Sequence, residues 1–276
     1  MAHPDPDRDI HAIQGVGAAA HVMQGRELEI LRIHVQQPAL ILVDRGIKTV
    51  RATHGAPVRA RPGQALVFAG GQTVDFTNTV TEGEHYEARW LVFDPALLDD
   101  AFYRLRATTA AAPSQARALT KVHAGLADAF ARATEALSCG LPVSVARQRM
   151  LEVMHWLLEA GVALSAPAAL ADISSRVRVL IGSGPQQEWS ADRVANELSV
   201  SQATLRRRLA TEGTTLTELL VDIRMATALT LLQATTQPVS HIALSVGYAS
   251  SSRFAVRFRQ RFGFAPTAVR GHERVL

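Results

Sequence analysis

The sequence has few of the residues that redox, disulfide-bonded or membrane proteins need. Cys139 is the single cysteine among 276 residues, which excludes an internal disulfide and a metal cluster held by several thiolates. No apolar run approaches the ~20 residues that span a bilayer. Acids and prolines begin the chain where a secretory signal needs a basic and then an apolar run. We therefore expect a cytoplasmic protein with no membrane segment.

Lysine is also scarce, and positive charge is unevenly placed. Lys48 and Lys121 are the only lysines, and surface exposure is the default expectation for both. The alternative is a buried lysine near the barrel mouth that pairs with an acidic ligand. Residues 172–276 contain 13 arginines against eight acidic residues, whereas the rest of the chain holds 16 basic and 17 acidic residues. The whole net charge of +4 thus comes from the C-terminal part. A basic domain beside a near-neutral one is typical of a protein that binds the DNA backbone.

A helix-turn-helix pattern occurs twice in this basic part. In each copy an alanine (Ala195 or Ala243) is followed four positions later by a turn residue, Ser199 or Gly247. The small alanine lets two helices cross closely, and the turn residue must accept a backbone conformation that glycine adopts at little cost. The first apolar residue of the next helix follows the turn residue by six positions in one copy and by seven in the other, so the duplication is approximate. The alternative is an ordinary antiparallel helix bundle with a charged surface.

Each second helix of these motifs has one apolar stripe. Leu205 and Leu209, like Phe254 and Phe258, are spaced i, i+4, so the arginines between them face outward. Residues 217–233 contain few helix breakers and predict one connecting helix, ~24 Å long if sixteen residues are helical. Such a rod would let one chain read two successive major-groove segments, ~34 Å apart along DNA.

The N-terminal part has a different pattern. Short apolar runs between turn signals, from about Glu27 to Phe93, predict β-strands in a small barrel or sandwich. Asp94 and Pro95 then indicate a helix start, and helical spacing follows. One apolar helical stripe is either core or a dimer contact, and it comprises Met150, Val153, Met154, Leu157 and Leu158.

The last hundred residues resemble the DNA-binding domain of AraC/XylS-type transcription regulators. The matching positions are Ser201, Thr204, Leu205, Arg207, Leu209, Gly213, Arg224, Ala228, Ile242, Ala243, Gly247, Tyr248, Phe254, Phe258, Arg259, Phe262, Gly263, Pro266 and Arg270. This resemblance implies seven helices, with reading helices near residues 201–211 and 250–262.

The resemblance also implies which side chains meet DNA. The expected contacts are Ser201, Gln202, Ala203, Thr204, Arg206 and Arg207 in the first motif, and Ser250, Ser251, Ser252, Arg253, Val256 and Arg257 in the second. Ala203 is too short to reach a base well, and Val256 stands where the family often carries a basic residue. Either Arg253 and Arg257 take over base reading, or the second helix contributes mainly phosphate contacts and indirect readout.

Three further arginines have competing roles, and a fourth has one expected role. For Arg208, Arg259 and Arg261, a phosphate contact competes with a solvated face or a salt bridge to an acid such as Glu212. We expect Arg224, in the connecting helix, to be a buried structural arginine.

The N-terminal part resembles, through its strands and the turn at residues 61–64, the cupin-like domain often joined to such DNA-binding domains. The fold class is then α+β with two domains. The expected order is a flexible N-terminus (1–25), a cupin-like β-barrel (26–105), a helical dimerisation region (106–164), a linker (165–171) and the DNA-binding domain (172–276). The implied function is transcription regulation, and the expected partners are promoter DNA, a small-molecule effector, RNA polymerase and a second copy of the chain.

Two other classes of function compete with this one. A metal-dependent cupin-type enzyme with a DNA-targeting domain would need clustered histidines, but His34, His54 and His85 stand apart and no His-x-His occurs. We therefore expect no catalytic residue, metal or cofactor. The glycines of residues 15–20 lack the βαβ context of a dinucleotide site and predict a flexible turn. An architectural DNA binder without effector would have a barrel filled by side chains.

Overall fold

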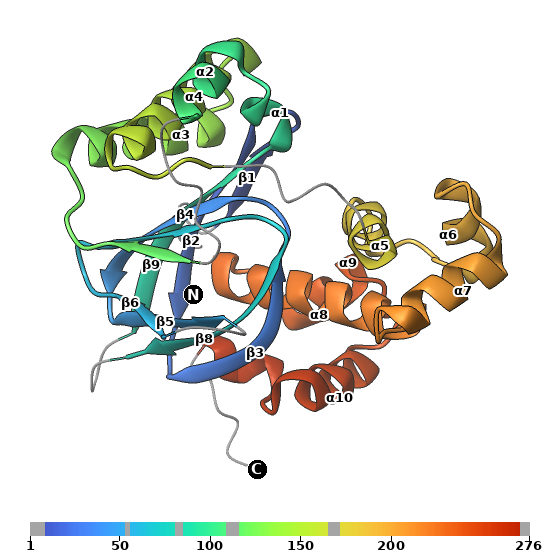
Figure 1. Cartoon of the computed structure of the whole chain (residues 1–276). Coiled ribbons are helices and arrows are strands. Elements are labelled where there is room, and N and C mark those ends of the chain that lie inside the picture. The colour runs from blue at the N-terminus through green and yellow to red at the C-terminus, as the bar shows by residue number, and fades with distance from the viewer. Residues whose placement is uncertain (1–8, 53–55, 81–84, 109–115, 165–171, 271–276) are drawn as a thin grey trace. The chain divides into compact units, whose positions relative to one another are not determined.

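The computed structural model of the chain contains two compact units, which Figure 1 shows as a β-rich and an all-helical part. It describes residues 9–52, 56–80, 85–108, 116–164 and 172–270. The first unit comprises residues 1–167 and 234–236, and the second comprises residues 168–233 and 237–276. The expected linker at residues 165–171 lies outside the described residues.

Two antiparallel sheets form the first unit. The six-stranded sheet has the order β1-β2-β9-β4-β7-β10, and the four-stranded sheet has the order β3-β8-β5-β6. The strands are Ile10–Ile13 (β1), Gly17–Gln24 (β2), Leu28–Val35 (β3), Ala39–Arg45 (β4), Ile47–Ala52 (β5), Val58–Ala60 (β6), Ala65–Phe68 (β7), Gln72–Thr79 (β8), Tyr86–Phe93 (β9) and Arg117–Leu119 (β10).

The predicted barrel is therefore not closed, because no strand pairing joins the two sheets in the described part of the chain. The chain passes from one sheet to the other at several connections, and the turn after β6 is one of them. Within it, Gly63 adopts a φ of +78° and donates its amide to the carbonyl of Val43 at 2.9 Å. The chain thus leaves the four-stranded sheet after only three residues of β6 and enters the other sheet as β7.

The N-terminal segment differs from the prediction of a flexible residue range 1–25. Its described part forms β1 and β2, and β2 pairs with β9 along its whole length, from Gly17 opposite Phe93 to Gln24 opposite Tyr86. A Cβ atom at Gly17 would lie 2.2 Å from the carbonyl oxygen of Val92, so glycine permits this close pairing. The glycine-containing segment therefore builds a hairpin at the sheet edge.

Helices of the first unit cover one face of the six-stranded sheet, as Figure 1 shows. They are Pro95–Leu98 (α1), Ala101–Ala107 (α2), Ala124–Ser138 (α3) and Val143–Glu159 (α4). As predicted, Asp94 caps α1, and its carboxylate accepts a hydrogen bond from the Ala96 amide at 2.9 Å.

The apolar stripe of α4 belongs to the core. Met150, Val153, Met154 and Leu157 have no exposed surface and share one cluster with sheet residues such as Leu40. Of the two readings left open by the sequence, core packing is the one that the structure supports.

Lys48 is buried between strands, contrary to the expectation of surface exposure. Its Nζ donates a hydrogen bond to Asn78 Oδ1 at 2.9 Å and lies 3.8 Å from the centre of the Phe76 ring. Burial lowers the pKa of Lys48 to about 7, because a charged ammonium loses its hydration there.

The second unit contains helices only, as far as residues 172–270 show. They are Ile173–Gly182 (α5), Ala191–Glu197 (α6), Gln202–Thr211 (α7), Leu216–Ala234 (α8), Val239–Ser245 (α9), Ser251–Phe262 (α10) and the 3₁₀ helix Pro266–Arg270 (η1). The connecting helix α8 has 19 residues and is thus ~28 Å long at the usual rise. None of the described helices is both long and apolar enough to cross a bilayer.

Candidate nucleic-acid interface

The two helix-turn-helix motifs share one turn geometry. Ser199 and Gly247, the predicted turn residues, both have left-handed backbones, with φ of +55° and +82°. The alanines four positions earlier, Ala195 and Ala243, are buried. In each copy the amide five positions after the alanine donates to that alanine's carbonyl at 2.9 Å. The repeat seen in the sequence is therefore a repeat of hydrogen bonds as well.

Serine caps begin both reading helices. Ser201 Oγ accepts from the Thr204 amide at 3.1 Å, and Ser250 Oγ accepts from the Arg253 amide at 3.4 Å. The cap follows the turn residue by two positions in the first copy and by three in the second. One extra residue in the turn thus explains why the two copies differ by one in their spacing.

Apolar stripes anchor the inner faces of α7 and α10. Leu205 and Leu209 join the core formed with α5, α6 and the start of α8. Phe254 and Phe258 have no exposed surface, and their ring centroids lie 5.6 Å apart. Each reading helix therefore has a fixed rotation about its axis, with the opposite face directed to solvent.

Arg224 has the structural role that the sequence predicts, but it is half-buried rather than buried. Its Nε donates to the carbonyl of Pro185 and its Nη2 to the carbonyl of Gln187, both at 2.9 Å. The guanidinium also lies 5.8 Å from the centre of the Tyr248 ring. A Cβ atom at Gly247 would approach Nη2 to 2.7 Å, so the turn glycine leaves room for this arginine.

In the first motif, the predicted contact residues fall into two groups. Ser201 and Thr204 pair their hydroxyls at 2.9 Å, and Gln202 Nε2 donates to Asp192 Oδ1 at 3.0 Å, so all three already stabilise the start of α7. Arg206 and Arg207 are exposed, and their side chains have no hydrogen-bond or ion-pair partner within the described residues. Ala203, also exposed, lies on the same helix.

In the second motif, the outward face of α10 carries serine, arginine and valine side chains. Ser251, Ser252, Arg253 and Arg257 are exposed, whereas Ser250 is half-buried at its cap. Arg257 Nη1 donates to Gln260 Oε1 at 3.3 Å. Val256 is 59% exposed, and Leu244 on α9 is similarly exposed at 58%.

The remaining arginines divide between structure and surface. Arg261 is paired with Asp222 at 2.6 Å, and its side chain is only 8% exposed, so the expectation of a phosphate contact is wrong for this residue. Its sequence position gave a signal, because it lies three residues after Phe258 and thus beside the buried stripe.

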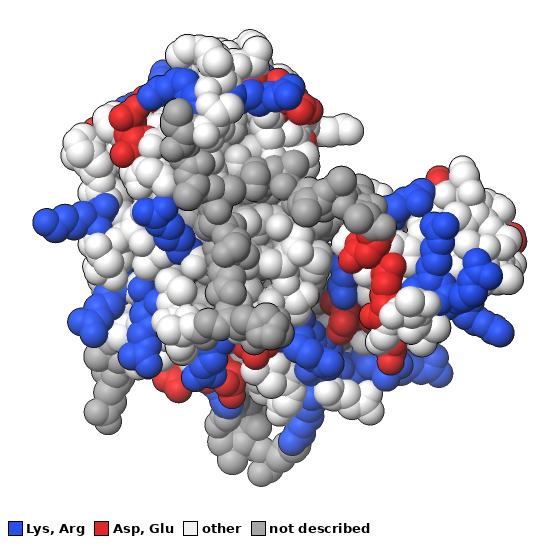
Figure 2. Space-filling model, in the orientation of Figure 1, with Lys and Arg blue, Asp and Glu red and all other residues white. Residues whose placement is uncertain are grey.

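Arg208 and Arg259 remain exposed and do not pair with Glu212. That carboxylate instead accepts the backbone amides of Ile173 and Ser174, each at 2.8 Å, at the start of α5. In Figure 2, basic side chains project from the second unit, with acidic ones between them.

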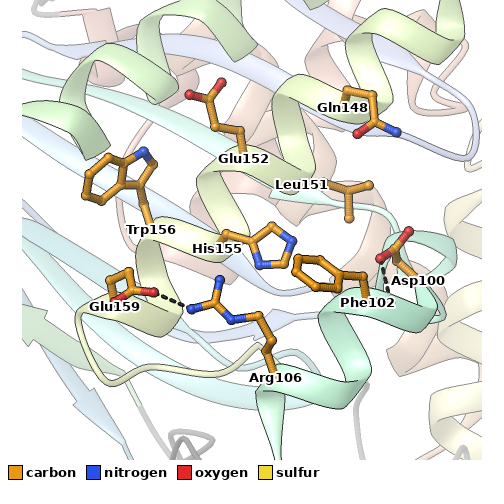
Figure 3. A pocket seen from close by; sticks show the side chains of 9 residues that line it. All are labelled: Asp100, Phe102, Arg106, Gln148, Leu151, Glu152, His155, Trp156 and Glu159. Atoms are coloured by element: carbon orange, nitrogen blue, oxygen red, sulfur yellow. Dashed lines mark hydrogen bonds and ion pairs between the residues drawn. The ribbon is translucent and has the colours of Figure 1, made fainter.

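A separate surface pocket of about 490 Å³ lies between α2 and α4 in the first unit (Figure 3). His155 stands at its centre, 5.2 Å from the Phe102 ring, and the Arg106–Glu159 ion pair closes one side. Burial, followed by the positive charge of Arg106, lowers the pKa of His155. Phe102 and Leu105, on α2, are 61% and 72% exposed.

The histidines that the sequence analysis considered as metal ligands do not converge. His34 hydrogen-bonds to Thr73 at 3.2 Å, His85 pairs with Glu87 at 3.2 Å, and His54 lies outside the described residues. Within the described ranges, no three His, Cys, Asp or Glu side chains are arranged to hold a metal ion. No observation therefore favours the enzyme alternative.

Comparison with known proteins matches the helical unit. Residues 194–272 fit the family model of a helix-turn-helix domain. The chain is 35% identical over 96 residues to the HTH-type transcriptional regulator GadX of Escherichia coli O6:H1, a match that covers 35% of each protein. It is 34% identical over 97 residues to the regulator YdeO of Escherichia coli K12, covering 35% of this chain and 38% of YdeO. The chain thus matches about a third of the length of these relatives.

The fold of the whole chain is similar to that of ToxT from Vibrio cholerae. The TM-score is 0.61 at 13% identity, and the match covers 91% of this chain and 97% of ToxT. This similarity supports a two-part fold of a β-rich domain followed by a helical domain.

Proposed function

We propose, from the premise that the second unit is an AraC-type helix-turn-helix domain, that the chain binds promoter DNA and regulates transcription. The observation that carries this proposal is the repeated motif. Two helices within one basic unit are each capped by serine and anchored by an apolar stripe, and each exposes to solvent the face that lies opposite its own stripe. Such a pair suits two successive major-groove segments.

Arginine side chains supply both the base contacts and the phosphate contacts to DNA. Arg207 lies at the middle of the outward face of α7, and its planar fork fits guanine O6 and N7. Arg208 and Arg259, at the edges of the reading helices, are placed for phosphate oxygens. Base reading and backbone binding are thus assigned to different side chains.

The salt dependence of binding tests the electrostatic part. The affinity of the full chain for duplex DNA should fall linearly with salt on logarithmic axes, because each phosphate contact releases counterions. Affinity that is unchanged between low and high salt would overturn the proposal.

Two substitutions separate the assigned roles. Arg207→Ala should weaken binding to a selected duplex about tenfold or more and leave random DNA nearly unchanged. Arg259→Ala should weaken both duplexes similarly and reduce the salt slope by about 0.9. Equal losses on both duplexes for Arg207→Ala would remove its base-reading role.

We further propose that the first unit modulates DNA binding by pairing with a second copy of the chain through α2. Phe102 and Leu105 support this, because two large apolar side chains stand exposed beside the α2–α4 pocket. The stripe of α4 is buried and is not the contact surface.

Sedimentation of charged variants tests this dimer surface. Leu105→Glu should convert a dimer to a monomer, whereas Val143→Glu, at another exposed apolar position of the same unit, should not. If both variants keep the oligomeric state of the wild type, pairing through α2 is contradicted. That result would favour modulation by a small-molecule effector that binds the pocket.

A further inference from the structure

The two reading helices place chemically opposite side chains at the same structural position. Counted from the capping serine, Leu205 and Phe254 are both the fourth residue, and Leu209 and Phe258 are both the eighth. The sixth residue is Arg207 in α7 and Val256 in α10. At roughly 100° per residue, the sixth position lies nearly opposite to both the fourth and the eighth. Arg207 and Val256 therefore mark the centres of the two outward faces.

The neighbours of Val256 one turn away along α10 leave its side chain uncovered. Ser252, one turn earlier, is short, and Gln260, one turn later, accepts a hydrogen bond from Arg257. Val256 itself is 59% exposed and cannot form a hydrogen bond through its side chain. A β-branched side chain in a helix has essentially one χ1 rotamer, so the two methyl groups of Val256 hold a fixed position.

Only one apolar group is available to such a side chain in the major groove. The four base pairs present donors and acceptors there, and thymine adds its C5-methyl group. A valine at the centre of a reading face gains from burying that methyl group and loses from covering a donor or acceptor that it cannot pair. Its chemistry thus favours thymine, by a smaller factor than the bidentate pairing of arginine favours guanine.

We propose that Val256 is a specificity-determining residue that reads a thymine methyl group, while Arg207 reads guanine in the other half of the site. This inference rests on the proposed function, because it requires α10 to enter the major groove. The two halves of the binding site would then differ in base composition, and the chain would bind in one orientation. Two similar helix-turn-helix motifs would in this way bind a DNA site whose two halves differ in sequence.

Removal of single methyl groups from the DNA tests the inference. A preferred duplex is first selected with the full chain from a random library, and each thymine is then replaced in turn by deoxyuridine, which lacks only the methyl group. One replacement in the α10 half should weaken binding by the wild-type chain about fourfold, the factor for one buried methyl group. Val256→Ala should lose this sensitivity, whereas Arg207→Ala should retain it.

A gain of new specificity provides the second measurement. Selection repeated with Val256→Arg should replace the thymine by guanine at that position and leave the α7 half unchanged. If no thymine replacement affects wild-type and Val256→Ala differently, or if Val256→Arg selects the same duplex as wild type, the inference is overturned while the proposed function stands. If the wild-type chain selects no duplex at all, the proposed function itself fails.

Discussion

Gly247→Ala should destabilise the helical unit far more than Gly263→Ala, although both glycines have almost the same backbone conformation. Their φ angles are +82° and +83°, so an alanine Cβ costs about 1–2 kcal/mol at either position through backbone strain alone. At Gly263 the added atom meets nothing within 4 Å. At Gly247 it would lie 2.7 Å from the guanidinium of Arg224. Gly263→Ala is therefore a matched control for the strain.

The additional cost at Gly247 comes from Arg224. To avoid the new methyl group, its guanidinium must leave the carbonyls of Pro185 and Gln187, and each of these partly exposed hydrogen bonds contributes about 1 kcal/mol. Gly247→Ala should thus reduce the free energy of unfolding by about 2 kcal/mol more than Gly263→Ala.

Urea unfolding of the full chain, combined with hydrogen exchange of peptides from residues 216–262, measures the loss of stability in Gly247→Ala and in Gly263→Ala. In an Arg224→Ala background, the cost of Gly247→Ala should fall to that of Gly263→Ala. Equal losses for the two glycines in the wild-type background would refute the reasoning, as would a Gly247 cost that does not depend on Arg224.

Three further predictions concern other buried contacts. Lys48→Met should stabilise the protein more at pH 7 than at pH 9, by on the order of 2 kcal/mol in urea unfolding. The reason is that the pKa of Lys48 is about 7 in the folded state and 10.5 in the unfolded state, so the wild type becomes more stable as pH rises from 7. Equal gains at the two pH values would contradict the burial of Lys48. Asp222→Ala should cost about 2 kcal/mol, since it removes the carboxylate that pairs with the largely buried guanidinium of Arg261, and a thermal scan showing no change would argue against that ion pair. Gly125→Ala should lower the melting temperature by several degrees, because its Cβ would lie 2.2 Å from the Trp156 ring, and an unchanged value would show that the ring moves freely.

The helix-turn-helix part could be predicted from sequence because its signals are local. The turn residue, the serine cap and the first apolar anchor of each copy lie within ten residues of one another, and each has its own chemical reason. Ser199 is one example of such a local prediction. Its left-handed backbone is predicted by its position in the repeat, opposite Gly247, and not by its residue type.

The β-rich part was predicted less well because its arrangement depends on distant pairing. The alanine-rich strand β2 contains one β-branched residue, Val22, and its pairing with β9, about 70 residues away, places it inside a sheet. The burial of Lys48 likewise depends on Asn78, 30 residues further along the chain. Whether the strands close a barrel or form two sheets depends on pairing between strands that are distant in the sequence, such as β4 with β9.

A hydroxyl-radical footprint of the full chain on its selected duplex is the most direct measurement of the central claim. If α7 and α10 each enter a major groove, two protected segments should lie about ten base pairs apart on one face of the DNA. Arg207→Ala should weaken protection of one segment first, and changes at Val256 should affect the other. A single protected segment, or uniform protection without sequence preference, would contradict DNA reading by two helices.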